Sequence, residues 1–486
     1  MIRFFIILSL LLVLASAEAA DFYIDPVNGS ISNDGSQSAP WSTLQGVLDA
    51  CKVRAGAYKT PWATTVPETI LNKCPTGAVT AGDTIYLMSG NQGEVTLNGF
   101  LNEDYITVKA YPGQTPTISH LWVIGSSYWR FEGITFSPEF ATPFAVYPNG
   151  IIEIEKHENV GPNNNITIKN STIYSVSDNV TSWPTLLDWF NGASRGIVSN
   201  GHNCLFEGNT IRNTEGCIAI NSSNGVALRN NTCNYQSGDV FGISDTDDLL
   251  IEGNTLKNII PSSEVYEDTH PDMMQFSSDN KQPSKPMYRI TVRRNYVNSL
   301  EEYGTHPLVG GNPQGITAFD GMIYNSLIEN NIIVVNSPHG TTWTGLIDSK
   351  IINNTVVWNP AGLGDYLTSH IRVYDSKVDL ETGLSYESYG NVVENNICTS
   401  INASDGAITK ANNIESVILD DHFVNAAAFN YTLVPTSTAI NSGATTNAPS
   451  VDYYSRRRGI HPDIGAVEYG SSSRLFRNVR LADPVE

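Results

Sequence analysis

Charged side chains are scarce in this sequence, and basic ones are the scarcer of the two signs. Asp, Glu, Lys and Arg make up 16% of the 486 residues, with 28 basic residues against 49 acidic ones and a formal net charge of −21. Binding to nucleic acid or to an anionic membrane surface requires a broad basic face. The composition therefore argues against nucleic acid and membrane surfaces as partners.

Long hydrophobic runs are also missing after the first 20 residues. Within those residues, Arg3 precedes an apolar run from Phe4 to Leu14, and small residues follow it. This pattern predicts a secretory signal peptide over residues 1–20. The run is shorter than the roughly 20 residues that span a bilayer. We therefore expect no membrane insertion and a secreted protein, extracellular or periplasmic.

No linker rich in Pro, Ser or Gly interrupts the middle of the chain, so no domain boundary is marked. We expect one monomeric domain over residues 21–470. It would include an amphipathic capping helix at about 41–56 and a closing segment at about 433–470. Residues 471–486 are predicted to form a flexible tail.

One short motif recurs along the chain: a small or polar residue, then Asn, then Thr or an apolar residue. Adjacent copies without an insertion are 22 or 23 residues apart, the length of one β-helix coil. Parallel coils stack at about 4.8 Å and superpose equivalent residues, which predicts an amide ladder. An apolar period of two excludes helical repeats. The motif is centred on Asn209, Asn231, Asn254, Asn295, Asn331, Asn354 and Asn396.

A column of alternating charge supports this register. The residues two positions before successive motif asparagines are Glu207, Arg229, Glu252, Arg293 and Glu329. Opposite charges on neighbouring strands contribute about 0.2–1 kcal/mol each. We therefore interpret Arg293 as a structural partner of its neighbours rather than as a catalytic cation.

The six cysteines show no spacing typical of a zinc site. An oxidising compartment permits disulfides, and a bond between Cys51 and Cys74 would close an irregular insertion. Cys204, Cys217 and Cys233 are at least as well explained as small buried residues of successive coils.

Two end segments suggest a family. Residues 22–50, FYIDPVNGSISNDGSQSAPWSTLQGVLDA, resemble the N-terminal start of the pectate-lyase-like right-handed β-helix superfamily. LVPTSTAINSGA at 433–444 and HPDIGAVEYG at 461–470 look like the closing segment of its secreted members. The resemblance implies an all-β, single-stranded right-handed parallel β-helix, a solenoid with an N-terminal capping helix. It does not choose among the lyases, hydrolases, epimerases and depolymerases of this fold.

The segment YEDTHPDMMQF at 266–276 holds the densest group of reactive side chains, namely Asp268, His270, Asp272 and Gln275. Its pattern HPDxxQ looks like a motif of uncharacterised secreted β-helix proteins, which implies a site without naming its reaction. The structural alternatives are an Asx turn for an aspartate and an extended amide ladder for Gln275.

The repeat also places distant residues together. Counting 15 residues back from the asparagine of the same coil, and aligning the flanking strands, predicts one column: Gly216, Asp239, Asp272, Gln314 and His339. Adjacent coils would hold the backbones of Asp239 and Asp272 about 5 Å apart. Two carboxylates this close share a proton or a metal ion. Calcium is the candidate ion for this pair, and no organic cofactor is expected.

These residues suit a lyase that cleaves a uronic-acid polysaccharide by β-elimination, which needs a base, an acid and a cation. We expect His270 to be the base, beside Asp239, Asp268 and Asp272. A C5 epimerase would use the same carbanion chemistry. The other predicted substrate contacts are Tyr266 or Tyr303 as the acid, Arg289 or Arg294 as an alternative to calcium, and Gln275, Gln314, His339 and Trp343.

The sequence is also compatible with two other functions. A glycoside hydrolase would need two carboxyl groups about 5 Å or 6.5–9.5 Å apart, which Asp239, Asp268 and Asp272 could supply. A non-catalytic adhesin would instead stack sugars on exposed tryptophans such as Trp343. All three hypotheses share an extracellular polysaccharide as the partner.

Overall fold

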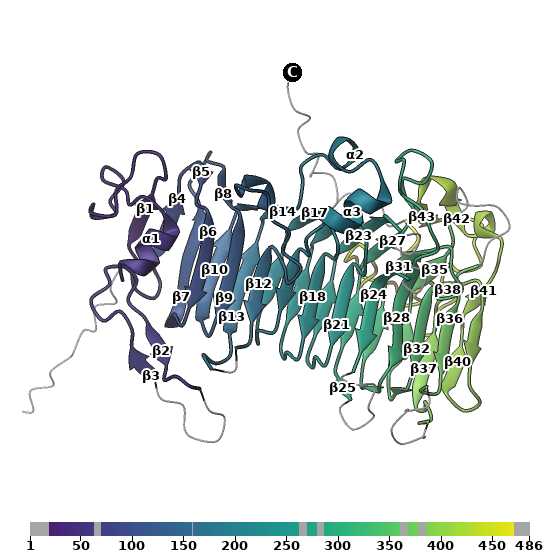
Figure 1. Cartoon of the computed structure of the whole chain (residues 1–486). Coiled ribbons are helices and arrows are strands. Elements are labelled where there is room, and N and C mark those ends of the chain that lie inside the picture. Colours follow the sequence, from purple (N-terminus) through teal and green to yellow (C-terminus); the bar gives the residue numbers. More distant parts are fainter. Residues whose placement is uncertain are drawn as a thin grey trace, which may run out of the picture.

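The computed structural model describes residues 19–62, 70–157, 159–261, 270–278, 286–359, 368–377 and 385–470. The predicted signal peptide and the predicted tail lie almost wholly outside these ranges. Within them the chain winds as an elongated stack of coils (Figure 1). Most coils contribute one strand to each of three long parallel sheets. The fold is a parallel β-helix, as the repeat predicts.

The first sheet is called the 15-stranded sheet. Its strands, in order, are β1 (Asp21–Ile24), β4 (Thr84–Leu87), β7 (Leu101–Ala110), β10 (Ser127–Glu132), β13 (Asn164–Lys169), β16 (Leu205–Glu207), β19 (Ala227–Arg229), β22 (Leu250–Glu252), β26 (Thr291–Arg293), β30 (Leu327–Glu329), β34 (Lys350–Ile352), β37 (Asn391–Glu394) and β40 (Ile408–Ala411), with β2 (Gly56–Tyr58) and β3 (Ile70–Asn72) attached at β7.

The second is called the 12-stranded sheet. It contains β5 (Gly90–Asn91), β8 (Pro116–Ile118), β11 (Thr135–Phe136), β14 (Thr172–Tyr174), β17 (Thr210–Thr214), β20 (Thr232–Gln236), β23 (Thr255–Ile259), β27 (Tyr296–Asn298), β31 (Ile332–Val334), β35 (Thr355–Val357), β38 (Ile397–Cys398) and β41 (Ile414–Glu415).

The third, called the 11-stranded sheet, carries the candidate site. It contains β6 (Glu94–Asn98), β9 (His120–Ile124), β12 (Ile152–Glu155), β15 (Ile197–Ser199), β18 (Ile218–Asn221), β21 (Phe241–Ser244), β24 (Asp272–Ser277), β28 (Gln314–Asp320), β32 (Thr341–Thr344), β36 (Ile371–Tyr374) and β39 (Ile401–Ala403).

Shorter elements decorate this stack. Small sheets are formed by β25 (Met287–Tyr288), β29 (Ile323–Tyr324) and β33 (Leu346–Ile347), and by β42 (Phe423–Asn425) and β43 (Asn430–Leu433). The α-helices are α1 (Leu44–Asp49), α2 (Asn179–Ser182) and α3 (Leu186–Gly192), and 3₁₀ turns span Pro138–Phe140, Leu419–Asp421 and Ala426–Ala428. None of the described helices is long and apolar enough to cross a membrane.

The motif asparagines form the predicted ladder at the corner between the 15- and 12-stranded sheets. Asn231 Nδ2 donates to Asn254 Oδ1 at 3.0 Å and to the carbonyl of Phe206 at 2.9 Å, while its Oδ1 accepts from Asn209. The pattern extends beyond Asn396 to Asn413, which follows it by only 17 residues. The side chain of Asn231 is fully buried, so these hydrogen bonds satisfy polar groups that water cannot reach.

The charge column is also confirmed. Glu252 is in register with Arg229 on one side and with Arg293 on the other. Nε of Arg293 lies 2.9 Å from a carboxylate oxygen of Glu252. Arg293 is therefore paired on the outer side of the 15-stranded sheet, as expected for a structural residue.

The N-terminal end is closed by α1, which buries Leu44, Val47 and Leu48. The helix is shorter than the predicted 41–56, because Ala50 caps it and Cys51 adopts a positive φ of 50°. The bond between Cys51 and Cys74 is present as predicted. A second disulfide links Cys217 to Cys233, a pairing that the sequence left open.

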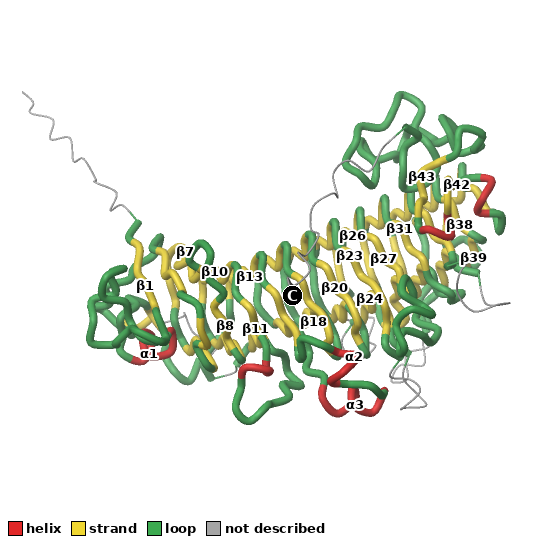
Figure 2. The backbone as a smooth tube through the Cα atoms, turned by 90° about the horizontal axis from the view of Figure 1, so that it is seen from above, coloured by secondary structure: helices red, strands yellow, loops and turns green. Residues whose placement is uncertain are grey.

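The C-terminal segment folds back along the outside of the 12-stranded sheet (Figure 2). Ala439, Ile464 and Val467 pack against outward-facing residues of that sheet, such as Val334 and Val357. Within the described chain, the segment predicted to close the helix thus covers the side of the last coils.

Candidate active site on the 11-stranded sheet

A cleft of about 580 Å³ lies on the outer side of the 11-stranded sheet. Its floor is formed by outward positions of adjacent strands, including Ala219 and Gly242, which are in register. These two residues have the smallest side chains available, so they leave open space above the sheet. Gln275 follows Gly242 in the same outward column and bounds the floor.

One wall of the cleft comes from the segment that connects β14 to β15. There α3 begins with a capping box in which Thr185 and Asp188 satisfy each other's backbone N–H groups, an arrangement that fixes a helix start. Trp189 is buried and packs against Trp183 in a small separate core. This core holds the wall in place beside the sheet.

The predicted column is observed. Asp272 is in register with Gln314, and Phe241 with Met274, which aligns Asp239 with Asp272. Ile316 pairs with Thr341, two residues after Gln314 and His339 respectively. The backbone N–H of Asp272 donates to Oδ1 of Asp239 at 2.9 Å. The two aspartates are thus joined directly across adjacent coils.

Asp272 is fully buried at the start of β24. Its Oδ2 accepts a hydrogen bond from Thr317 Oγ1 at 2.7 Å and a longer one from Gln275 Nε2 at 3.4 Å. Its Oδ1 lies 3.7 Å from Nδ1 of His270. A buried carboxylate needs such compensation. Asp272 is therefore placed to orient His270 rather than to meet a ligand itself.

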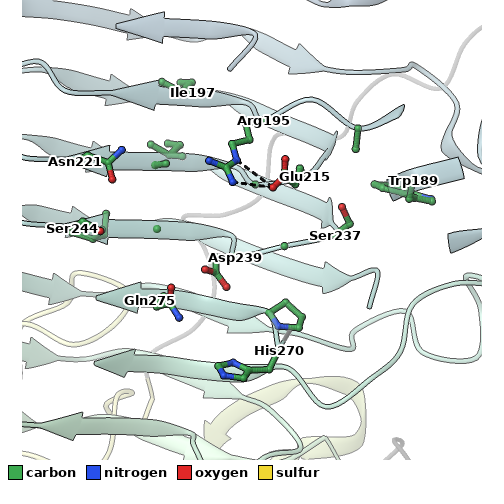
Figure 3. Close-up of a pocket in the computed structure, with 18 of the residues that line it drawn as sticks. Trp189, Arg195, Ile197, Glu215, Asn221, Ser237, Asp239, Ser244, His270 and Gln275 are labelled. Carbon is green, nitrogen blue, oxygen red and sulfur yellow. Dashed lines mark hydrogen bonds and ion pairs between the residues drawn. The ribbon is translucent and has the colours of Figure 1, made fainter. Parts of the chain in front are cut away.

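His270 presents its ring to the cleft, with 56% of the side chain exposed (Figure 3). Its pKa is raised above 6.5, chiefly by its interaction with the Asp272 carboxylate, although partial burial opposes the shift. Pairing through Nδ1 leaves Nε2 available. A histidine held in this way can accept a proton from a bound molecule and keep it beside a carboxylate.

Asp239 has a different environment. Burial first, and then repulsion from Asp272, raises the pKa of Asp239 to about 7. Its carboxyl group is therefore largely protonated in mildly acidic solution and lines the same cleft. The site thus combines a proton acceptor, His270, with a proton donor, Asp239.

Two charged residues of the cleft were missed in the sequence. Arg195 and Glu215 form an ion pair at 3.0 Å, with 48% and 40% of their side chains exposed. Figure 3 shows this pair beside Asp239. Ile197 pairs with Ile218, so Arg195 is in register with Gly216 and belongs to the same column. The cleft therefore contains a cation that can contact an anionic ligand.

The arginines that the sequence suggested for this role lie elsewhere. Arg289 follows β25 and binds Asp248 at 2.8 Å. Arg294 follows β26 and pairs with Glu252. Both stand at corners of the 15-stranded sheet, and neither lines the cleft.

The predicted role of Trp343 in sugar contact is wrong. Its indole is fully buried, lies 5.4 Å from the ring of Phe276 and donates to Thr341 at 2.7 Å. Tyr303 lies in the loop after β27 and does not line the cleft. Asp268 and Tyr266 fall outside the described residues.

His339 and Gln314 continue the column beyond Asp272. His339 Nδ1 is 3.1 Å from Thr342 Oγ1 and 3.3 Å from a guanidinium nitrogen of Arg372. Burial, and then Arg372, lowers the pKa of His339 to about 4, so its ring is neutral near pH 7. The buried Oε1 of Gln314 has no hydrogen-bond partner among the described residues.

The calcium ion expected at Asp239 and Asp272 stays a prediction. Calcium takes six to eight oxygen ligands, whereas Asp239 and Asp272 supply four carboxylate oxygens. Two of these already accept hydrogen bonds from Asp272 N–H and Thr317. Among the described residues, no group of three or more His, Cys, Asp or Glu could hold a metal ion.

Comparisons with known proteins show a similarity in fold only. No protein-family model and no curated protein matches this chain. Among solved structures it is similar to pectate lyase Pel9A, with a TM-score of 0.44 and 14% identity over 94% of this chain and 98% of the other. XylC in complex with xylose gives 0.44 and 10% over 79% and 76%. A rhamnogalacturonan lyase gives 0.41 and 14% over 94% and 97%.

These likenesses name no reaction for this chain. The assignment as a parallel β-helix follows from its own strand order and register.

Proposed function

We propose that this chain is a secreted enzyme that acts on a uronic-acid-containing polysaccharide by abstracting a proton from the sugar. The observation that carries the proposal is the pairing of exposed His270 with buried Asp272, beside Asp239, whose pKa is raised to about 7. Elimination and C5 epimerisation share this first step. Of these two reactions, we propose β-elimination.

The chemistry can be followed atom by atom. Nε2 of His270 takes the C5 proton, which is acidic because the carboxylate of the sugar is neutralised by a cation; Arg195 has this role. The electron pair of the C5–H bond forms a C4–C5 double bond as the C4–O bond breaks. Asp239 donates its proton to the departing oxygen. Asp272 stabilises the imidazolium that forms.

Secretion is supported by the two disulfides, Cys51–Cys74 and Cys217–Cys233. Such bonds persist mainly in oxidising compartments outside the cytoplasm. A polysaccharide substrate would be met in the same compartment.

Hydrolysis is the second candidate, because Asp239 and Glu215 both line the cleft. Asp239 would be the acid and Glu215 the nucleophile or base. Asp272 cannot take this second role, since it is fully buried and cannot reach an anomeric carbon.

One assay separates these reactions. The protein is incubated with polyuronates and with neutral glycans, while ultraviolet absorbance of unsaturated products, reducing ends and C5 configuration by NMR are followed. The proposal expects new absorbance with a polyuronate. Reducing ends without absorbance would mean hydrolysis, inverted C5 centres would mean epimerisation, and no change on any glycan would contradict an enzymatic role.

A further inference from the structure

A second cation lies on the same outer face as the cleft. Gln275 is in register with Thr317, Thr317 with Thr342, and Thr342 with Arg372. All four are outward positions of the 11-stranded sheet. Arg372 therefore stands three coils from Gln275, which is about 14 Å along the β-helix axis.

The positive charge of Arg372 is not compensated by the described chain. Its guanidinium contacts the neutral ring of His339 at 3.3 Å and the hydroxyl of Tyr374 at 3.4 Å, and it lies 5.2 Å from the centroid of the Tyr374 ring. No carboxylate oxygen of the described residues is within 4.0 Å of it. A half-buried guanidinium that lacks an anion is costly. In a chain with 49 acidic residues, this arrangement favours an anionic ligand.

Further polar side chains adjoin this cation. Asn402 is in register with Arg372 on the next strand, and its Nδ2 is 3.2 Å from Nδ1 of His370. Both side chains are half-buried. The planar guanidinium of Arg372 is suited to binding a carboxylate with two hydrogen bonds.

The opposite end of the same column is acidic, although burial, and then repulsion from Glu155, raises the pKa of Glu153 to about 7. Glu153 is in register with Trp122 and with Val198, on the other side of the cleft from Arg372. The neighbouring Glu155 accepts a hydrogen bond from the indole of Trp122 at 3.0 Å. A polyanion that extends in this direction would meet the like charge of Glu155, so its acidic residues are favoured on the Arg372 side.

We propose that Arg372 binds the carboxylate of a sugar residue several positions from the reacting bond, so that an acidic polysaccharide lies along the β-helix axis from the cleft towards Arg372. The inference rests on the proposed function, because it assumes that the chain enters the cleft. It adds a distal subsite and the direction in which the bound polysaccharide lies. It also adds a preference for long acidic chains over short ones.

The test compares Arg372→Gln with Arg130→Gln. Arg130 is the matched control, since its guanidinium also lies over a tyrosine, at 4.6 Å from the Tyr105 ring centroid, but on the 15-stranded sheet. Binding of polygalacturonate, alginate and neutral xylan is measured by calorimetry in a His270→Ala background. KM is measured in the active protein with short and long oligouronides.

The proposal expects Arg372→Gln to weaken polyuronate binding roughly tenfold, the loss of one charge-assisted hydrogen-bonding group. KM should rise similarly for long oligouronides and stay unchanged for the shortest ones, with little change in kcat. Arg130→Gln should match the parent in both measurements. High salt should shrink the difference between the two variants.

Two results would overturn the subsite, and a third would overturn only the proposed reaction. Equal polyuronate binding by both variants, in a protein that eliminates uronates, would reject the role of Arg372 alone. Arg372-dependent binding without any turnover would keep the subsite and reject the proposed reaction. Absence of polyuronate binding by the parent protein would reject the subsite outright.

Discussion

The backbone N–H of Asp272 donates to the carboxylate of Asp239 at 2.9 Å, across two adjacent coils. One donor does not offset the burial and the mutual repulsion of the two acids, so the pKa of Asp239 rises to about 7. The protonation of the site therefore depends on the stacking of β21 on β24. Coil register and proton transfer are linked through this contact.

Replacing His270 by Ala or Asp272 by Asn should lower kcat on a polyuronate by about 100-fold or more, the usual contribution of a general base. His270→Ala removes the acceptor. Asp272→Asn keeps the shape but removes the charge that stabilises the imidazolium. The measurement is the initial rate of unsaturated product formation.

Folding is checked in both variants by thermal melting. His270 is mostly exposed, so His270→Ala should melt like the parent protein. A matched control is His202→Ala, which changes a half-buried histidine away from the cleft. Full activity in His270→Ala would reject the assignment of the base.

The rate should show a bell-shaped dependence on pH. Activity rises with pH as His270 loses its proton, and the pKa of His270 lies above 6.5. Activity falls again as Asp239 loses its proton, at about 7. A rate that stays constant from pH 6 into the alkaline range would contradict these roles.

Asp272→Asn gives the same profile a second test. Asp272 is the main cause of the raised pKa of His270. It also contributes to the raised pKa of Asp239. The residual activity of the variant should therefore show both limbs at lower pH. If neither limb of the pH profile moved, groups other than His270 and Asp239 would be responsible for the profile.

Most of the fold could be predicted because a β-helix repeats its register. The spacing of Asn231 and Asn254 identifies one coil, and alignment of the flanking strands places Asp239 beside Asp272. Counting back a fixed number of residues gives the wrong position where a coil differs in length by one residue. Counting 15 residues back from Asn209 gives Ser194, whereas the strand pairing puts Arg195 in the column. The cleft cation was missed for this reason.

The remaining site residues depend on side-chain direction, which the repeat does not reveal. Trp343 was expected to meet a sugar, but it points into the core, where Phe276 packs against it. Arg289 and Arg294 stand near His270 in the sequence and lie on another wall of the solenoid. Arg372 comes after a coil with an insertion and carries no sequence motif.

Chelation should leave the activity unchanged. The protein is treated with EDTA, dialysed into metal-free buffer and assayed on a polyuronate with and without added calcium. The proposed mechanism uses Arg195 to neutralise the sugar carboxylate, so the rate should persist. Loss of activity that calcium restores would instead support the ion predicted at Asp239 and Asp272, and would make Arg195 dispensable.

The asparagine ladder should dominate the stability of the central coils. Asn254 is buried and bonds to Asn295, to the carbonyl of Leu228 and to the backbone N–H of Asn231. Asn254→Ala leaves these partners unsatisfied, which should cost about 2–4 kcal/mol in the free energy of unfolding. Chemical denaturation measures the change, with Asn28→Ala, at an exposed position, as the control. Because the ladder lies at the opposite corner from the cleft, the folded Asn254→Ala variant should keep its kcat. Equal stability of both variants would mean that the ladder contributes little to the free energy of unfolding.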